Sequence, residues 1–293
     1  MTRTLKRSVA TVLALLLPSL VAHAAPRARS GPVEHAQLLG ALKLDGQLFH
    51  VQGVEVDGQH IFVTSVDRKA RRGYLHEFDQ TTGKFMRRIE LTDGVRYHPG
   101  GISIAGGSIW VPVAEMRRNS SAVIEEIDLA SLEVRRKIAV RDHLGCVAAS
   151  ASELVAGNWD SRELYIFDLG HDANVKVVPN PSRVAFQDMK LVDGQLVAGG
   201  QAGGHKGAVD WIDMASMTVT RSLAAGATRH PRLFHKVHSY AREGMTVKGR
   251  DLYFVPDDGK ASRLFHFRLD DAGAGSVAAP ATIVPPLKIA SAT

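Results

Sequence analysis

Three histidines recur at a regular spacing in the first half of the sequence, and two acidic residues continue the pattern in the second half. His50, His98 and His143 are separated by 48 and 45 residues, and Asp188 and Glu243 occupy related positions further on. Imidazole and carboxylate groups together bind zinc, and carboxylates alone suit calcium. If the fold gathers these residues, the sequence predicts a divalent-metal site held by His50, His98 and His143.

The acidic residues and one amide lie two residues after the start of their repeats. These positions hold Gln52, Asp188 and Glu243, and residues two apart on a strand share one side. The sequence therefore predicts that Gln52 contacts a ligand and, if the protein is an enzyme, that Glu243 or Asp188 acts as the acid/base group. An alternative is that the histidines only hydrogen-bond neighbouring repeats within a water-filled polar channel.

Loops that follow the second strand of each repeat are polar, and several are basic. We expect five of their residues to contact a ligand: Arg68, Arg117, Trp159, Asp160 and His205. A basic rim favours a small polar or anionic ligand. The alternative is an ordinary solvated loop surface. An insertion over 224–239 adds three histidines, and we expect it to act as a lid: His230, His235 and His238.

The elements that would position these residues form a repeat of 43–55 residues. Each unit reads as four short strands with a turn opened by an aspartate: Asp79, Asp128, Asp168, Asp213 and Asp270. An aspartate at the start of a turn accepts backbone hydrogen bonds, so we assign these five a structural role. Four antiparallel strands in a repeat of this length are typical of a β-propeller blade.

Five inner strands are recognisable, but only four complete outer strands follow them. The stretch 38–44 has the pattern of the missing strand. We therefore predict an all-β, five-bladed propeller with four-stranded antiparallel blades, its ring closed by the N-terminal strand. The C-terminal stretch 282–289 competes for the same edge. A solenoid is the rival architecture, but the sequence lacks distinct capping repeats.

The first 24 residues have the features of a signal peptide. Arg3, Lys6 and Arg7 precede an apolar run, and Ala22-His23-Ala24 resembles a cleavage site. No lipobox cysteine follows, so we expect a periplasmic or secreted protein without a membrane anchor. The predicted organisation is a signal peptide at 1–24, a linker at 25–34, the propeller at 35–275 and an Ala/Pro-rich tail at 276–293.

Composition narrows the class of protein further. The 293 residues are 45% hydrophobic and 23% charged, as in folded domains, and Cys146 is the single cysteine, which excludes an internal disulfide and a CxxC motif. Removal of the three basic residues in the signal peptide lowers the formal charge from +6 to +3. We therefore expect no nucleic-acid partner, and a monomer.

The repeats resemble those of secreted bacterial propellers of the YVTN-like and quinoprotein-like types. His50-Val51-Gln52-Gly53-Val54 and Thr82-Gly83-Lys84 are similar to the first-blade motifs of five-bladed glutamine cyclotransferases. Glu243-Gly244-Met245-Thr246 is similar to that family's Glu-Gly-Leu-Thr element, although here it falls in the last blade. Such Glu-Gly elements also occur in phytase-like and lactonase-like propellers.

These observations lead to three hypotheses about function. The first is an exported propeller that binds a small polar or anionic ligand, with or without a divalent metal, at a His-rich channel mouth. The second is a hydrolase, lactonase or cyclotransferase that uses the same channel. The third is a protein-interaction scaffold, because the same fold serves many functions.

Overall fold

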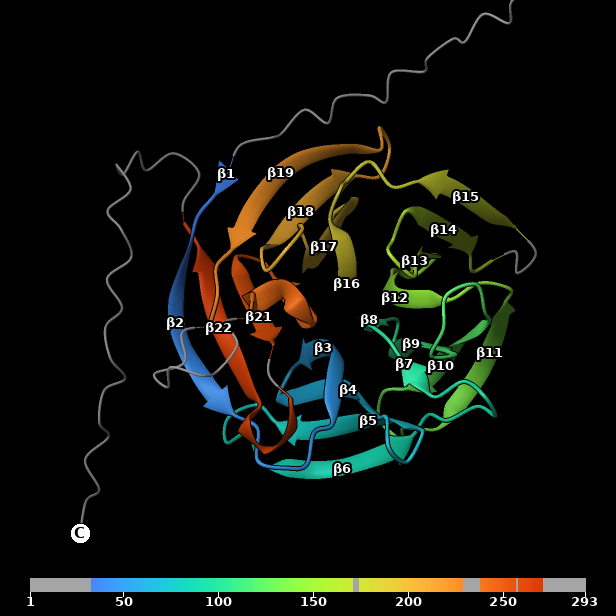
Figure 1. Cartoon of the computed structure of the whole chain (residues 1–293), viewed down its shortest axis with the longest axis horizontal. Helices are drawn as coiled ribbons and strands as arrows, with labels where there is room; N and C mark the ends of the chain where they lie inside the picture. The colour runs from blue at the N-terminus through green and yellow to red at the C-terminus, as the bar shows by residue number, and fades with distance from the viewer. Residues whose placement is uncertain (1–32, 171–173, 229–237, 257, 271–293) are drawn as a thin grey trace, which may run out of the picture.

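Five β-sheets are arranged as blades around a central axis in the computed structural model (Figure 1). The structure describes residues 33–170, 174–228, 238–256 and 258–270. In these ranges the helical elements are two short 3₁₀ turns, η1 (Tyr240–Arg242) and η2 (Gly259–Ala261). No helix formed by the described residues is long and apolar enough to cross a membrane.

The first three blades follow one another along the chain. Blade 1 contains β3 (His50–Asp57), β4 (His60–Asp67), β5 (Arg72–Asp79) and β6 (Phe85–Glu90). Blade 2 contains β7 (His98–Pro99), β8 (Ser103–Ala105), β9 (Ser108–Ala114), β10 (Ala122–Asp128) and β11 (Val134–Val140). Blade 3 contains β12 (Leu144–Ala149), β13 (Glu153–Asn158), β14 (Glu163–Asp168) and β15 (Val175–Pro179).

The last two blades include the N-terminal strands. Blade 4 contains β16 (Ala185–Val192), β17 (Gln195–Gln201), β18 (Gly207–Asp213), β19 (Thr218–Ala225) and β1 (Val33–Glu34). Blade 5 contains β20 (Gly244–Lys248), β21 (Asp251–Val255), β22 (Arg263–Leu269) and β2 (Ala36–Lys43). Five blades built mainly of four antiparallel strands confirm the predicted fold.

Ring closure follows the prediction. Strand β2 pairs antiparallel with β22, so the N-terminal segment supplies the outer strand of the last blade. The competing stretch 282–289 lies outside the described residues. The structure adds one feature that the sequence did not suggest: β1 pairs parallel with β19, where Arg221 Nε lies 2.6 Å from Glu34 Oε1. The N-terminal segment therefore ties blade 5 to blade 4 as well as closing the ring.

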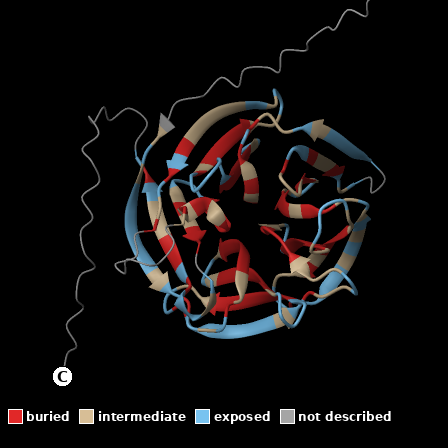
Figure 2. Cartoon of the chain, viewed as in Figure 1, coloured by how far each residue is buried: buried red, intermediate tan, exposed pale blue. Residues whose placement is uncertain are grey.

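Burial falls from the axis to the rim (Figure 2). All seven residues of β9 are buried, whereas nearly every residue of the outer strands β6 and β15 is exposed. Apolar clusters fill the spaces between blades, and their burial is the main stabilising contribution. Four of the five repeated aspartates accept turn hydrogen bonds from the backbone as expected, namely Asp79, Asp128, Asp168 and Asp213. The residues that follow Asp270 lie outside the described ranges.

Glycines allow the inner strands to meet near the axis. A Cβ atom on Gly53 would lie 2.8 Å from the Cα of Gly101, and one on Gly244 would lie 2.7 Å from the carbonyl carbon of Gly53. Such distances leave no room for a side chain. The channel is therefore closed at this level, and a small molecule bound on the axis must lie outside it.

Candidate functional site

A β-bulge sets which inner-strand residues face the mouth. The unpaired extra residue is Gln52 in β3, Gly145 in β12 and Gln187 in β16. Gln187 is therefore the structural equivalent of Gln52, and Asp188 lies one residue further along than the repeat alignment placed it. The sequence analysis placed Gln52 and Asp188 at equivalent positions, and the structure shows that this assignment is wrong by one residue.

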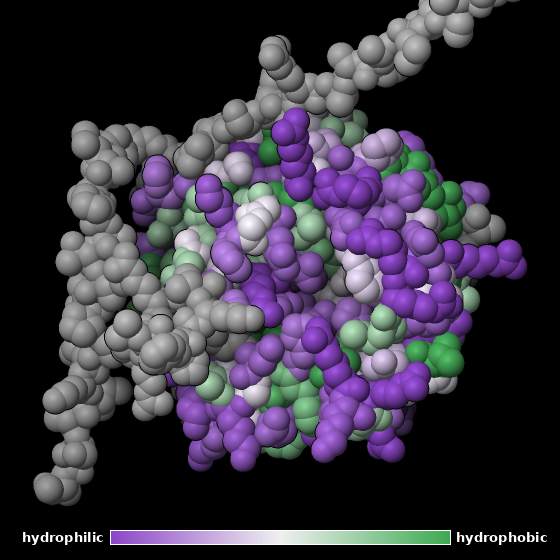
Figure 3. Space-filling view, viewed as in Figure 1, coloured by the Kyte–Doolittle hydropathy of each residue, from purple (hydrophilic) through white to green (hydrophobic). Residues whose placement is uncertain are grey.

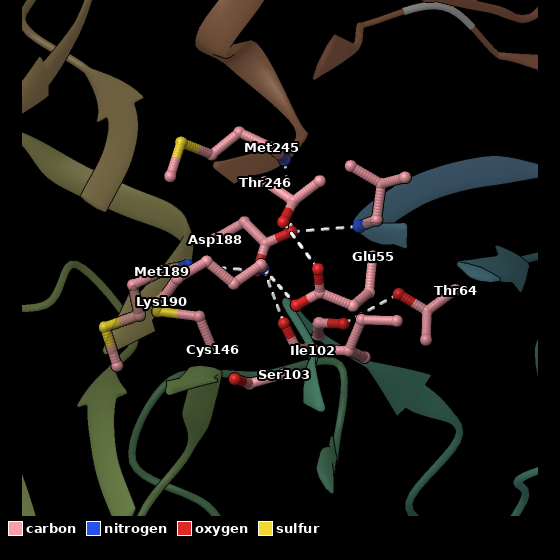
Figure 4. Close-up of polar contacts among 12 residues, drawn as sticks. Glu55, Thr64, Ile102, Ser103, Cys146, Asp188, Met189, Lys190, Met245 and Thr246 are labelled. Atoms are coloured by element: carbon pink, nitrogen blue, oxygen red, sulfur yellow. Dashed lines mark hydrogen bonds and ion pairs between the residues drawn. The ribbon is translucent and has the colours of Figure 1, made fainter. Parts of the chain in front are cut away.

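Asp188 lies in the closed centre of the propeller rather than at its mouth (Figure 4). Its Oδ2 accepts hydrogen bonds from the backbone N–H groups of Val54 at 2.9 Å and Met245 at 3.1 Å. Its Oδ1 accepts from the N–H of Met189 at 2.9 Å and from Lys190 Nζ at 2.6 Å. These hydrogen bonds join blade 4 to blades 1 and 5. The side chain of Asp188 is 0% exposed, so no part of it is accessible to a ligand. The acid/base role predicted for Asp188 therefore has no support in this geometry.

Burial and hydrogen bonding act in opposite directions on Asp188. Burial raises the pKa of Asp188 to about 7, while Lys190 and the N–H of Val54 favour the ionised carboxylate and oppose the shift. All four hydrogen bonds are donated to the carboxyl group, an arrangement that suits the ionised form.

Two further charged side chains extend this central network, and both were missed in the sequence analysis. Lys190 Nζ donates to the carbonyl oxygen of Ile102 at 2.5 Å and lies 3.9 Å from Glu55 Oε2. Glu55 Oε1 accepts from Thr246 Oγ1 at 2.5 Å and lies 3.0 Å from Lys248 Nζ. Each of these residues is a charged side chain inside an otherwise apolar inner strand. Because an unpaired buried charge is costly, this pattern could have predicted that the two residues have charged partners.

Glu243 lies in the mouth and is 4% exposed. Its Oε1 is 3.0 Å from Arg242 Nε. Burial raises the pKa of Glu243 to about 8, Arg242 and Arg68 oppose this rise, and the negative charge of Asp258 adds to it. Near neutral pH the carboxyl group therefore holds its proton for most of the time and can donate a hydrogen bond.

His98 is the least satisfied polar side chain of the mouth. Its Nδ1 is buried and has no hydrogen-bond partner among the described residues. Burial, together with the positive charges of His143, His50 and Arg68, lowers the pKa of His98 to about 3. His98 is therefore a neutral imidazole with an unused polar atom, a feature that is uncommon in folded proteins and calls for a partner.

The other two histidines of the predicted trio already have partners. His50 Nδ1 lies 3.2 Å from Asp258 Oδ2, and Asp258 Oδ1 also accepts a hydrogen bond from the N–H of Val51. His143 Nδ1 lies 3.2 Å from the carbonyl oxygen of Arg117. His50 thus fastens the loop of blade 5 to blade 1, and His143 is oriented by blade 2.

The structure does not form the predicted metal site. His98 and His143 are neighbours, with ring centroids 5.5 Å apart. Within the described residues, however, no group of three or more His, Cys, Asp or Glu residues is placed to hold a metal ion. The physical reason is that His50 and His143 are turned toward the partners described above.

The predicted rim residues have different surroundings. Trp159 packs against His143 with ring centroids 4.4 Å apart, and the Arg118 guanidinium lies 5.4 Å from the Trp159 centroid. Asp160 pairs with Arg118 at 2.6 Å. Trp159 therefore packs between His143 and Arg118, whereas Asp160 holds that arginine in place.

The remaining predicted contacts are divided between the mouth and other surfaces. Gln52 is buried, and its Nε2 donates to the carbonyl oxygen of Val51 at 2.7 Å. Arg117 is exposed and pairs with Glu115 at 2.9 Å. His205 lines a separate pocket with Arg242. Of the inserted histidines, His238 is described, whereas His230 and His235 lie outside the described residues.

Hydrophilic side chains gather around the centre of the face seen in Figure 3. In the mouth, one positively charged side chain lacks an acidic partner among the described residues. Arg68 influences both His98 and Glu243 electrostatically, and Arg68 has no ion pair among the described residues. The mouth therefore offers a protonated carboxyl group, a neutral imidazole and a free guanidinium.

One solved structure in particular shares the fold. The crystal structure of Myxococcus xanthus glutaminyl cyclase aligns with a TM-score of 0.59 and 17% identity, covering 82% of this chain and 98% of that chain. A PQQ-bound aldose sugar dehydrogenase from Streptomyces coelicolor aligns with a TM-score of 0.45 and 11% identity, covering 82% and 100%. The resemblance to five-bladed glutamine cyclotransferases is thus confirmed for the architecture.

No curated protein matches the chain. A family model matches residues 33–271, which include every strand of the propeller. The chain therefore belongs to the family of unknown function DUF6454.

Proposed function

We propose that the channel mouth binds a small polar or anionic molecule between His98, Glu243 and Arg68. The buried, unpartnered Nδ1 of His98 is the observation that carries this proposal. A buried polar atom without a hydrogen bond costs about 1–3 kcal/mol, and a ligand that bonds to it recovers that free energy. Ligand binding explains why such an atom is retained at the mouth.

The neighbouring groups define what the ligand must offer. Burial raises the pKa of Glu243 to about 8, so the protonated carboxyl group donates a hydrogen bond near neutral pH. Arg68 adds a guanidinium that attracts negative charge. An acceptor-rich ligand, such as one bearing a carboxylate, matches these donors. Trp159 provides an adjacent aromatic surface for an apolar portion.

A calorimetric comparison tests this site. Purified wild-type protein is screened by thermal shift with small carboxylates, amino acids and dipeptides, and hits are titrated into wild type and His98→Phe. We expect His98→Phe to weaken binding about tenfold, the loss of one hydrogen bond to a buried group. His35→Ala, an exposed histidine on the N-terminal segment, is the matched control. Equal affinities for wild type and His98→Phe would exclude His98 from the site.

A second candidate function is catalysis of intramolecular acyl transfer. Its support is the raised pKa of Glu243, because strongly shifted carboxyl groups are typical of acid/base sites. In glutaminyl cyclisation the substrate amine attacks its own side-chain amide and ammonia leaves. Glu243 would give its proton to the departing nitrogen and regain one from the attacking amine. Incubation with a glutaminyl dipeptide, followed by ammonia detection, tests this: wild type should release ammonia and Glu243→Gln should not.

We also propose that the protein is exported, because residues 1–24 have the sequence of a signal peptide. Cell fractionation followed by N-terminal sequencing tests this proposal. The expected result is mature protein in the periplasm or medium that starts at Ala25. Full-length protein confined to the cytoplasm would contradict it.

A further inference from the structure

A second pocket lies beside the mouth, between the turn that follows β17 and the segment that leads into β20. Its volume is about 330 Å³, near the lower end of the range for small-molecule sites. Seven residues line it: Gln201, Gly204, His205, Lys206, His238, Ser239 and Arg242.

The lining of this pocket is basic and contains no carboxylate. Lys206 and Arg242 bring two positive charges, and His205 and His238 bring two imidazoles. Lys206 has no ion pair within the part of the chain that the structure describes. Other basic side chains, such as Arg87, Arg136 and Arg268, have an acidic partner, so cations that face a pocket without a carboxylate create a local excess of positive charge. Such an excess attracts anions.

Arg242 connects this pocket to the mouth. Its Nε lies 3.0 Å from Glu243 Oε1, which occupies one of the five guanidinium N–H donors. Because Arg242 also lines the pocket, its other donors are available there. Glu243 holds its proton for most of the time near neutral pH, so the charge of Arg242 is only partly compensated.

Both walls of the pocket are held by hydrogen bonds. The N–H of Ala202 donates to the carbonyl oxygen of Lys206 at 2.9 Å. The N–H of Lys206 donates to the carbonyl oxygen of Gly203 at 3.2 Å. On the other side, the buried Ser239 donates from Oγ to the carbonyl oxygen of Ala225 at 2.9 Å. The two walls are therefore positioned before any ligand arrives, which lowers the entropy cost of binding.

We propose that this pocket binds a phosphate group through His205, Lys206 and Arg242. Guanidinium and ammonium groups are the usual partners of phosphate oxygens, and an arginine offers two parallel N–H donors to such a group. The group can come from free inorganic phosphate or from a small phosphate ester, for which the pocket leaves room. This inference does not depend on ligand binding at His98.

Titration calorimetry with inorganic phosphate, on the full chain at constant ionic strength, tests the proposal. We expect saturable binding that is about tenfold weaker or more in Lys206→Ala and in His205→Ala, because each removes a hydrogen bond to a charged group. The matched control is Lys176→Ala, an exposed lysine on the outer strand β15, which should bind as wild type does. Glycerol 3-phosphate is the second probe, and its affinity relative to phosphate identifies which source the pocket prefers.

Two results would overturn the proposal: no saturable binding of either probe at millimolar concentration, or unchanged affinity in both Lys206→Ala and His205→Ala. Circular dichroism of each variant confirms that it is folded. His98→Phe separates this proposal from the proposed function, because it should weaken ligand binding at the mouth and leave phosphate binding unchanged.

Discussion

Lys190 Nζ lies 2.6 Å from Asp188 Oδ1, and both side chains are buried at the axis of the propeller. Asp188 also accepts backbone hydrogen bonds from blades 1 and 5, while Lys190 donates to a carbonyl group of blade 2. This pair therefore connects four of the five blades at the point where the inner strands converge. Its role is to hold the ring together beneath the mouth.

Removal of one partner of this pair should strongly destabilise the protein. Lys190→Met leaves the carboxyl group of Asp188 buried without its cation, and the expected loss is about 3–5 kcal/mol in the free energy of unfolding. Urea unfolding followed by circular dichroism measures it. Lys248→Met, which alters a half-exposed lysine beside Glu55, is the control and should cost much less. Equal unfolding midpoints for wild type and Lys190→Met would show that the pair does not stabilise the ring.

Glu243 should make stability depend on pH in a defined direction. Its pKa rises from an ordinary value of 4.5 to about 8 on folding, so the folded state binds more protons than the unfolded state between these values. The free energy of unfolding should therefore fall as the pH rises from about 5 to about 8, and the contribution of Glu243 should change little above that.

Glu243→Gln cannot titrate and isolates this effect. Chemical denaturation at several pH values should show Glu243→Gln gaining stability relative to wild type as the pH rises. Asp188 is present in both proteins, so its own titration largely cancels in the comparison. A difference between the two proteins that stays constant with pH would mean that Glu243 titrates near its ordinary value.

His98 and His76 should respond differently to replacement by phenylalanine. His98→Phe removes a polar atom without a partner, so we expect stability to be unchanged or higher by about 1 kcal/mol. His76 Nε2 lies 2.8 Å from Ser65 Oγ, so His76→Phe leaves that hydroxyl group unpaired and should lower stability by about 1–3 kcal/mol. Thermal and urea unfolding compare them. Equal losses in both variants would indicate that His98 has a structural partner.

Closure of the ring by β2 should be essential for folding. Leu42 pairs with Leu264 of β22 and lies two residues before Leu44, whose N–H donates to the carbonyl oxygen of Ser262. The N–H of Leu42 therefore also faces β22, and proline there removes a ladder hydrogen bond. We expect Leu42→Pro to lower the free energy of unfolding by about 1–3 kcal/mol, because it leaves a carbonyl group of β22 without its donor. A chain that begins at residue 45 should aggregate, because it exposes the edge of β22. The control is a chain that begins at residue 33. Monomeric, folded protein from the shorter chain would show that another segment closes the ring.

The architecture could be predicted from the sequence because the blades of a propeller share a repeated sequence pattern. Strand alternation and the aspartate turns recur in every blade, so five inner strands and the missing outer strand were both visible. The stretch around Leu42 was recognisable as that outer strand because its apolar pattern matched the others. The same repeat singled out His98 and Glu243, and Arg68 acts electrostatically on both.

The tertiary structure decided which of the repeated positions remain available for chemistry. Asp188 and Gln52 appear equivalent in the sequence, but the bulge residue of β16 that corresponds to Gln52 is Gln187, so Asp188 lies one residue further along, in the closed centre. His50 and His98 also appear equivalent, yet only His98 has an unpartnered nitrogen, because the loop with Asp258 satisfies His50. Bulges and loop contacts arise from close packing between distant strands, and packing of this kind leaves no periodic signal in the sequence.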